Sequence, residues 1–213
     1  MSQIEQKFRQ FLSKNPEIET CYQKKLINRR SLARYLIYQN IAKSNQLEAI
    51  IAMLRRFEFK EKKQPKDLFS KIKVSIKDKI VILDFQKEKE LIQKLEKLIE
   101  KTNYDRGDTL KIVVGSSSVK VFLDEENEKK VEDIVEKFKL QNRFSDISEI
   151  SITFPEDAIK EQGILSTITK ELTVNEVVIS ELLTASPELI IYLKEEFVLN
   201  AYVILKRLQK NNV

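Results

Sequence analysis

The sequence predicts an α+β protein, in which an all-α, winged helix-turn-helix-like domain precedes two ferredoxin-like βαββα units. Apolar residues recur at helical spacing up to about residue 57, whereas after residue 70 they also alternate or form short blocks typical of strands. The order strand, helix, strand, strand, helix then occurs twice. These patterns predict domains at 1–66, 67–140 and 141–213.

Three helices are expected in the N-terminal segment. Apolar residues within 4–12 lie on one face of a first helix, which ends before Pro16 because the residue preceding a proline disfavours the helical conformation. After a short apolar segment, Asn28 is a suitable N-cap for a second helix. We expect Ser44 or Asn45 to cap a third helix, which runs to about residue 57.

A polar stretch at 60–67, broken by a proline, is a candidate linker to the first βαββα unit. Residues 72–76 alternate and residues 80–85 form an apolar block, so Lys77 and Asp78 are expected to make a hairpin turn between two strands. A helix at 91–99, strands at 110–114 and 119–123, and a helix at 131–138 follow.

The second unit repeats this order. The pattern predicts a strand at 147–154, a helix at 164–172, strands at 177–183 and 189–193 with Pro187 in their turn, and a helix at 198–208. No strand is predicted after this last helix. We therefore expect residues 72–76 to complete the edge of the second unit, so that the two units interlock.

The residue inventory disfavours most enzyme classes. The chain has no His, one Cys and three Gly, which excludes Ser-His and Cys-His nucleophiles, His-ligated metals, a structural zinc site and a Gly-rich phosphate loop. Carboxylate, lysine or magnesium-dependent chemistry remains open. We expect a protein that is not an enzyme and holds no cofactor or metal.

The compartment is predicted from what the sequence lacks. The longest apolar runs are far shorter than the roughly 20 residues that span a bilayer, and the first residues do not resemble a signal peptide. The single Cys21 suits a reducing compartment. These features predict a cytoplasmic protein without a membrane partner.

Charge is divided unevenly along the chain. Residues 1–66 contain 15 Lys and Arg against 6 Asp and Glu, a net charge of +9, although the whole chain has a net charge of +5. This asymmetry favours a polyanionic partner for the N-terminal domain. Cations near a helix N-terminus bind phosphates, and short polar side chains reach base edges. The predicted DNA-binding residues are Arg29, Arg30, Arg34, Lys43, Ser44, Asn45, Gln46, Ala49, Arg55 and Arg56.

Three interpretations of this domain remain open. It is a DNA-binding helix-turn-helix, for which paired half-sites favour a homodimer, a small helical domain with ordinary solvated cations, or a helical domain that serves dimerisation.

Several segments resemble a known family. Residues 28–36 and 49–57 are similar to the N-terminal domain of archaeal predicted regulators of amino-acid metabolism, whose C-terminal parts carry ACT domains. Residues 150–158, 162–165 and 186–189 extend the resemblance over nearly the whole chain. It implies tandem ACT domains and an amino-acid ligand at the loop joining the first strand of a unit to its first helix.

In the second unit this loop contains a glycine at a helix start, where exposed backbone N–H groups and the helix dipole favour a carboxylate. The predicted ligand-binding residues are Glu161, Gln162, Gly163, Ile164 and Leu165, with Ser180 and Glu181 as partners for an amino group. The corresponding loop of the first unit, around residues 85–89, has no glycine. The alternative is that Gly163 merely begins a helix.

Two functions follow from these features. The first is a ligand-responsive regulator of transcription that binds DNA and an amino acid. The second is a regulatory or scaffold protein that does not bind DNA and acts by contact with a metabolic enzyme.

Overall fold

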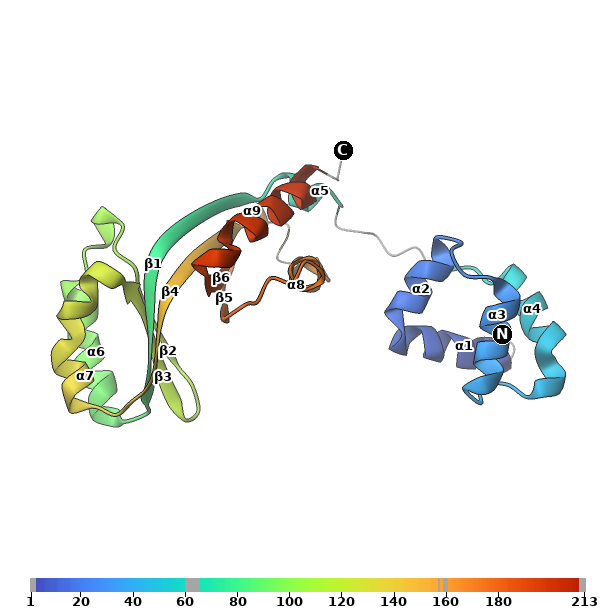
Figure 1. The fold of residues 1–213 in the computed structure, drawn as a ribbon, viewed down its shortest axis with the longest axis horizontal. Coiled ribbons are helices and arrows are strands. Elements are labelled where there is room, and N and C mark those ends of the chain that lie inside the picture. Colours follow the sequence, from blue (N-terminus) through green and yellow to red (C-terminus); the bar gives the residue numbers. More distant parts are fainter. Residues whose placement is uncertain (1–2, 60–65, 157, 159–160, 211–213) are drawn as a thin grey trace. The chain divides into compact units, whose positions relative to one another are not determined.

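The computed structural model describes residues 3–59, 66–156, 158 and 161–210, and it divides into two compact units (Figure 1). We call residues 1–63 the helical unit and residues 64–213 the sheet unit. The helical unit contains α1 (Gln3–Lys14), α2 (Pro16–Gln23), α3 (Arg29–Tyr38), η1 (Ser44–Gln46) and α4 (Leu47–Arg56).

One apolar core holds the helices of the helical unit together. Phe8 of α1, Leu36 of α3 and Ile50 of α4 are fully buried in it. The predicted N-cap of α3 is confirmed, because the Asn28 side chain accepts hydrogen bonds from the backbone N–H groups of Arg30 and Ser31 at 2.9 and 3.2 Å. Such a cap contributes about 1 kcal/mol to helix stability.

Three expectations about the helical unit are corrected. The short apolar segment before Asn28 contains a fourth helix, α2, which begins at Pro16 because proline is well suited to the first position of a helix. Ser44 and Asn45 do not cap α4 but lie in the 3-10 turn η1, and the Gln46 side chain accepts the Lys43 N–H at 2.9 Å, so that α4 begins only at Leu47. Residues 3–59 form helices and turns without a strand, so this described part of the chain has no wing. Most of the predicted linker, residues 60–65, lies outside the described residues.

The sheet unit is built on a six-stranded antiparallel sheet with the strand order β2-β3-β1-β4-β6-β5. In Figure 1 the long strands β1 and β4 run side by side through the centre and bend together. The elements are α5 (Lys66–Ser70), β1 (Lys73–Gln86), α6 (Lys89–Lys101), η2 (Tyr104–Arg106), β2 (Leu110–Val114), β3 (Ser118–Asp124), η3 (Glu125–Val131), α7 (Glu132–Lys137), β4 (Leu140–Thr153), α8 (Ile164–Val174), β5 (Glu181–Ala185), β6 (Glu188–Lys194) and α9 (Glu195–Lys210).

The strands β1 and β4 are shared between two interlocked halves. The strands of the first half are β2, β3, the second part of β1 (residues 80–86) and the first part of β4 (residues 140–146). The second half consists of residues 147–153 of β4, β5, β6 and residues 73–77 of β1, which pair with residues 149–153. The expectation that residues near 72–76 complete the second unit is therefore confirmed.

The predicted hairpin turn at Lys77 and Asp78 is wrong. Residues 73–77 and 80–85 both pair with β4, so they form one strand that is irregular between Lys77 and Ile80. Lys79 and Asp146 take left-handed conformations with φ of 57° in the middle of β1 and β4. Such a bulge bends a strand instead of reversing it, which curls the sheet.

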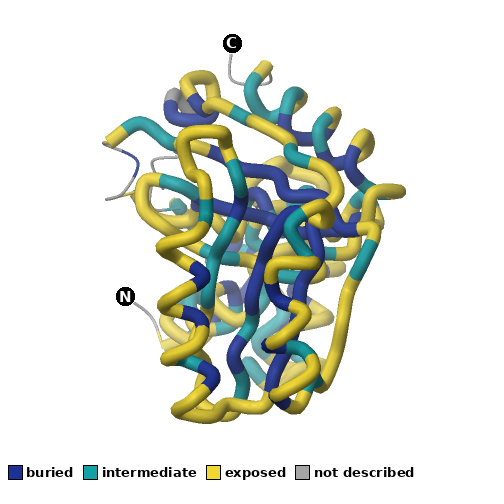
Figure 2. Tube along the Cα trace, turned by 90° about the vertical axis from the view of Figure 1, so that its left-hand side faces the viewer, coloured by how far each residue is buried: buried dark blue, intermediate teal, exposed yellow. Residues whose placement is uncertain are grey.

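The helices of the described sheet unit cover one face of the sheet. Leu83 and Leu91 belong to the core under α6 and α7, whereas Ile150 and Ile168 belong to the core under α8 and α9. On the opposite face the curled sheet closes on itself around a smaller core that includes Tyr192, whose ring lies 4.6 Å from that of Phe122. Figure 2 shows the buried positions concentrated along the strands. No helix within the described residues is long and apolar enough to cross a membrane.

Candidate functional site

A cavity of about 480 Å³ lies in the second half of the sheet unit, between the β4–α8 connection and the turn joining β5 to β6. Its wall is mostly apolar, with carboxylate and hydroxyl side chains and the start of α8 at its border. The lining residues are Phe154, Ala158, Glu161, Gly163, Ile164, Leu165, Ser166, Thr184, Ser186, Pro187, Glu188 and Leu189.

Gly163 positions the N-terminus of α8 at this cavity. Its φ of 88° is a left-handed conformation that other residues rarely adopt. The Gly163 carbonyl accepts hydrogen bonds from the N–H of Thr167 at 2.9 Å and from the Ser166 hydroxyl at 3.0 Å. The N-cap residue of α8 is Gly163 itself, which has no side chain to cap the helix, so among the described residues the N-cap leaves the positive end of the helix dipole to an anion.

The turn between β5 and β6 supplies the opposite wall. The Phe154 N–H donates to the Pro187 carbonyl at 2.9 Å, which ties this turn to the end of β4. Thr184, Ser186 and Glu188 lie on or beside the turn and line the cavity. The N-terminus of α8 and carboxylate side chains thus border the same mostly apolar space.

The structure gathers four of the seven predicted ligand residues at this cavity: Glu161, Gly163, Ile164 and Leu165. The other three do not line it. Gln162 is exposed beside Gly163, the Ser180 N–H donates to the Tyr192 carbonyl at 2.8 Å, and Glu181 forms an ion pair with Lys120 of β3.

Sequence reasoning missed the contribution of the β5–β6 turn. The pattern placed a strand at 177–183, but β5 begins only at Glu181, so the turn rather than the middle of the strand lies opposite α8. The segment 186–189, already noted for its family resemblance, was the available signal.

In the first half, the loop between β1 and α6, which is equivalent to the β4–α8 connection, is hydrogen-bonded to the β2–β3 turn. The Lys87 N–H donates to the Ser117 carbonyl at 3.1 Å, and the Lys87 ammonium donates to the Gly115 carbonyl at 2.9 Å. The loop between β1 and α6 therefore lies against the β2–β3 turn.

A buried polar network joins the two halves on the face without helices. The carboxylate of Glu149 in β4 accepts hydrogen bonds from the Tyr192 hydroxyl at 2.7 Å, the Lys111 ammonium at 2.6 Å and the Ser151 hydroxyl at 3.1 Å. Burial, and then the negative charge of Glu149, raises the pKa of Tyr192 above its ordinary range. Lys111 comes from β2 in the first half and Glu149 from the second half. Because the network connects these two halves, it stabilises the curled form of the sheet.

Seven of the ten predicted DNA-binding residues line two surface grooves of the described helical unit. We call the first, of about 640 Å³, the arginine groove, because Arg29, Arg30 and Arg55 line it together with Lys25. Glu48 also lines it and pairs with Arg30 at 3.5 Å.

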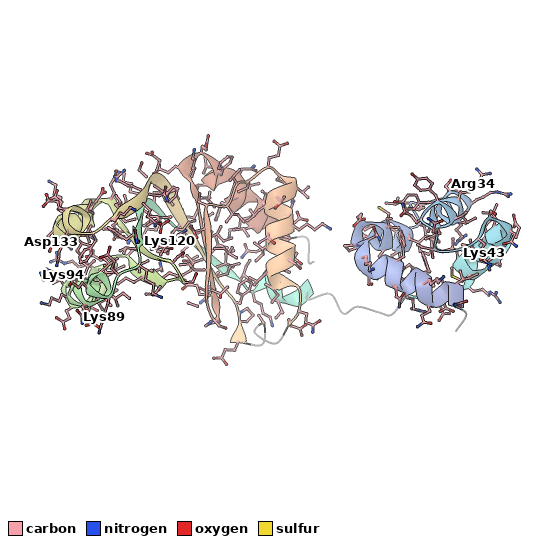
Figure 3. All side chains as sticks on the ribbon, turned by 90° about the horizontal axis from the view of Figure 1, so that it is seen from below. Arg34, Lys43, Lys89, Lys94, Lys120 and Asp133 are labelled. Atoms are coloured by element: carbon pink, nitrogen blue, oxygen red, sulfur yellow. The ribbon has the colours of Figure 1, made fainter. Side chains whose placement is uncertain are left out.

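The second, of about 870 Å³, we call the amide groove. It is lined by Gln3, Ile4, Lys7, Ile37, Asn40, Ile41, Ala42, Lys43, Ser44, Asn45 and Gln46, with no acidic residue among them. Arg34, Ala49 and Arg56 are exposed but line neither groove. Figure 3 shows Arg34 and Lys43 on the outside of the helical unit.

Nothing in the described part of the chain suggests a metal centre. Among these residues no three or more Asp, Glu or Cys side chains come together as ligands, and the sequence contains no His.

The element order, the strand order and the curl of the sheet define an ACT-like α+β fold for the sheet unit. No family model matches the sequence, and no curated protein matches it. Several solved structures match part of this chain in fold. The aspartate kinase of Clostridium acetobutylicum matches 64% of this chain with a TM-score of 0.54 and 14% identity, and this chain spans about a third, 34%, of that enzyme.

Two smaller chains are matched almost completely. A chain described as a C-terminal regulatory domain of aspartate kinase from Porphyromonas gingivalis is covered to 98%, with 66% of this chain, 14% identity and a TM-score of 0.51. The ligand-free regulatory subunit of aspartate kinase from Thermus thermophilus is covered to 95%, with 63% of this chain, 9% identity and a TM-score of 0.50. At these identities the matches establish a shared fold.

Proposed function

We propose that this chain is an amino-acid-responsive regulator without catalytic activity of its own, which binds an amino acid in its sheet unit and DNA through its helical unit. It acts in the cytoplasm as a homodimer. The observation that carries this proposal is the cavity at Gly163, because it combines an open helix N-terminus with carboxylates in a mostly apolar space.

The cavity suits the chemistry of an α-amino acid. A ligand carboxylate is stabilised by the N–H groups and dipole at the start of α8. The ammonium group pairs with Glu161 or Glu188, and an apolar side chain contacts Phe154 and Leu165. The resemblance of residues 150–158, 162–165 and 186–189 to ACT-containing regulators supports this choice of ligand class.

Regulation requires only a modest coupling between ligand and DNA. An amino acid that favours one geometry of the dimer by about 1–3 kcal/mol changes DNA affinity 5- to 150-fold. In this scheme the ligand alters the spacing of two helical units on paired half-sites.

Thermal unfolding against the twenty amino acids tests the sensor. A ligand at 100 times its dissociation constant adds about 2.7 kcal/mol of stability. Leu165→Glu places a carboxylate beside the start of α8 without straining the backbone, and it should abolish the stabilisation. Leu199→Glu, on an exposed part of α9, is the matched control and should preserve it. A flat response of the wild-type chain to all twenty would refute the sensor.

Binding of duplex DNA over a salt series tests the helical unit. Several phosphate contacts produce a steep loss of affinity with rising salt, and each neutralised cation lowers the slope by about one. Arg55→Gln with Arg56→Gln should therefore reduce both affinity and slope, whereas Arg207→Gln on α9 should not. Absence of binding at low salt would refute this half of the proposal.

A second candidate is regulation of a metabolic enzyme by direct contact, without DNA. It is favoured by the matches to regulatory parts of aspartate kinases and by exposed apolar residues on the sheet unit, where Val174, Val178, Leu199 and Val203 are 61–77% exposed. The duplex-binding series distinguishes the two, because the second candidate predicts no binding.

A further inference from the structure

The helical unit carries an aromatic pair on its surface. Tyr35 and Tyr38 of α3 are 42% and 78% exposed, and their rings are stacked 6.5 Å apart with an angle of 27°. Tyr35 is held from below by Phe11 of α1, whose ring lies 6.1 Å away in an edge-on arrangement. Phe11 thus supports the Tyr35 ring, and the Tyr38 ring that stacks on Tyr35 is exposed to solvent.

All charged residues of α3, the helix that carries this pair, are arginines. Arg34 precedes Tyr35 and lies one helical turn before Tyr38, while Lys7 and Lys14 lie one turn on either side of Phe11. All three cations are exposed, and none of them forms an ion pair within the described residues. The nearest acidic residue along α1, Glu5, pairs with Arg9, whose guanidinium lies over Phe57 rather than over the tyrosines.

A groove without acidic residues begins at the same helices. Lys7 and Ile37 line the amide groove, which continues to Lys43 and Asn45. Its amide and hydroxyl side chains both donate and accept hydrogen bonds, as nucleobase edges require. Stacked aromatic rings beside a cationic groove are the arrangement by which proteins bind single strands.

We propose that Tyr35 and Tyr38, with Arg34 and the amide groove, bind single-stranded nucleic acid by stacking of its bases on the tyrosine pair. A second copy of this chain is the poorer occupant, because a symmetric contact would place Arg34 and Lys7 against like charges. A duplex is also poorer, since its bases are stacked inside and only phosphates reach the tyrosines. This inference does not depend on the amino-acid site or on duplex binding by Arg55 and Arg56.

The test uses the full chain and fluorescently labelled oligothymidylate and oligouridylate of about twelve nucleotides, a length within the range of known single-strand sites. Tyr38→Ala should weaken binding of at least one oligonucleotide about tenfold, as expected from the loss of one stacked base. Tyr38→Phe keeps the ring and should bind like the wild type. Tyr104→Ala, which removes a 51% exposed tyrosine of the sheet unit, is the matched control.

Two further measurements separate stacking from charge. Replacing the oligonucleotide by one with abasic sites should remove the difference between wild type and Tyr38→Ala, and a duplex of equal length should bind both equally. The proposal is overturned if Tyr38→Ala binds single strands like the wild type, or if the loss persists with abasic sites. It is equally overturned if Tyr38→Ala dissociates a dimer while leaving oligonucleotide affinity unchanged, because the surface then serves self-association.

Discussion

Replacing Tyr192 by Phe probes the polar network that joins the two halves of the sheet. The change removes one hydroxyl, which donates to the Glu149 carboxylate at 2.7 Å, and leaves the ring in place against Phe122. A hydrogen bond to a charged group contributes about 1.5–3 kcal/mol. Because Glu149 keeps Lys111 and Ser151 as partners, we expect the free energy of unfolding to fall by an amount near the lower end of this range, about 1.5 kcal/mol.

Urea unfolding of the full chain, followed by circular dichroism, measures this loss. Tyr104→Phe is the control, since Tyr104 is 51% exposed and surface changes of this kind usually alter stability by less than about 0.5 kcal/mol. If Tyr192→Phe falls within the same limit, the network does not stabilise the sheet as argued.

Alkaline pH provides an independent check on Tyr192. Burial and the neighbouring Glu149 and Glu188 raise its pKa in the folded chain, whereas in the unfolded chain the hydroxyl ionises near pH 10. The folded state therefore holds this proton longer. The difference in free energy of unfolding between the wild type and Tyr192→Phe is therefore fully present below about pH 10. Above that pH it declines by at most about 1.4 kcal/mol per pH unit. The Lys111 ammonium also faces this ring, 5.9 Å from its centroid, so Lys111→Met is compared at each pH.

Three further outcomes are expected. Gly163→Ala should lower stability by about 1 kcal/mol from its positive φ, and Gly107→Ala, with φ of 84°, should cost the same, as urea unfolding of both variants will show. A double-mutant cycle of Lys120→Met and Glu181→Gln should give a coupling of about 1 kcal/mol, because the two side chains are only 26% and 25% exposed; additive effects would contradict a bridge between the halves. Phe8→Ala should remove about 3–5 kcal/mol from the helical unit and expose it to proteolysis while residues 66–210 stay protected; loss of both units together would contradict their independence.

Local signals predicted much of the fold. The β2 and β3 strands were predicted within a residue or so of their bounds, and Asn28 was correctly identified as the cap of α3. The prediction failed at Lys77 and Asp78, where two polar residues between apolar segments suggested a turn. A bulge with a left-handed Lys79 has the same local pattern, so only the pairing partner distinguishes the two.

The candidate site was predicted from one side only. Gly163 was identifiable because a glycine at the start of a helix is a local feature. Thr184 and Glu188 were not, because their place at the cavity depends on where β5 begins and how its hairpin lies against α8.

By itself, then, the sequence determined the order and type of most helices and strands, the basic N-terminal segment and the glycine at the start of α8, since periodicity, charge and capping act over a few residues. The tertiary structure alone decided that β1 serves both halves, that Glu149 is buried among Tyr192, Lys111 and Ser151, and that seven of the ten predicted DNA-binding residues line two separate grooves. Each of these depends on pairings between residues far apart in the chain, which follow from packing of the whole sheet or helix bundle and leave no local trace.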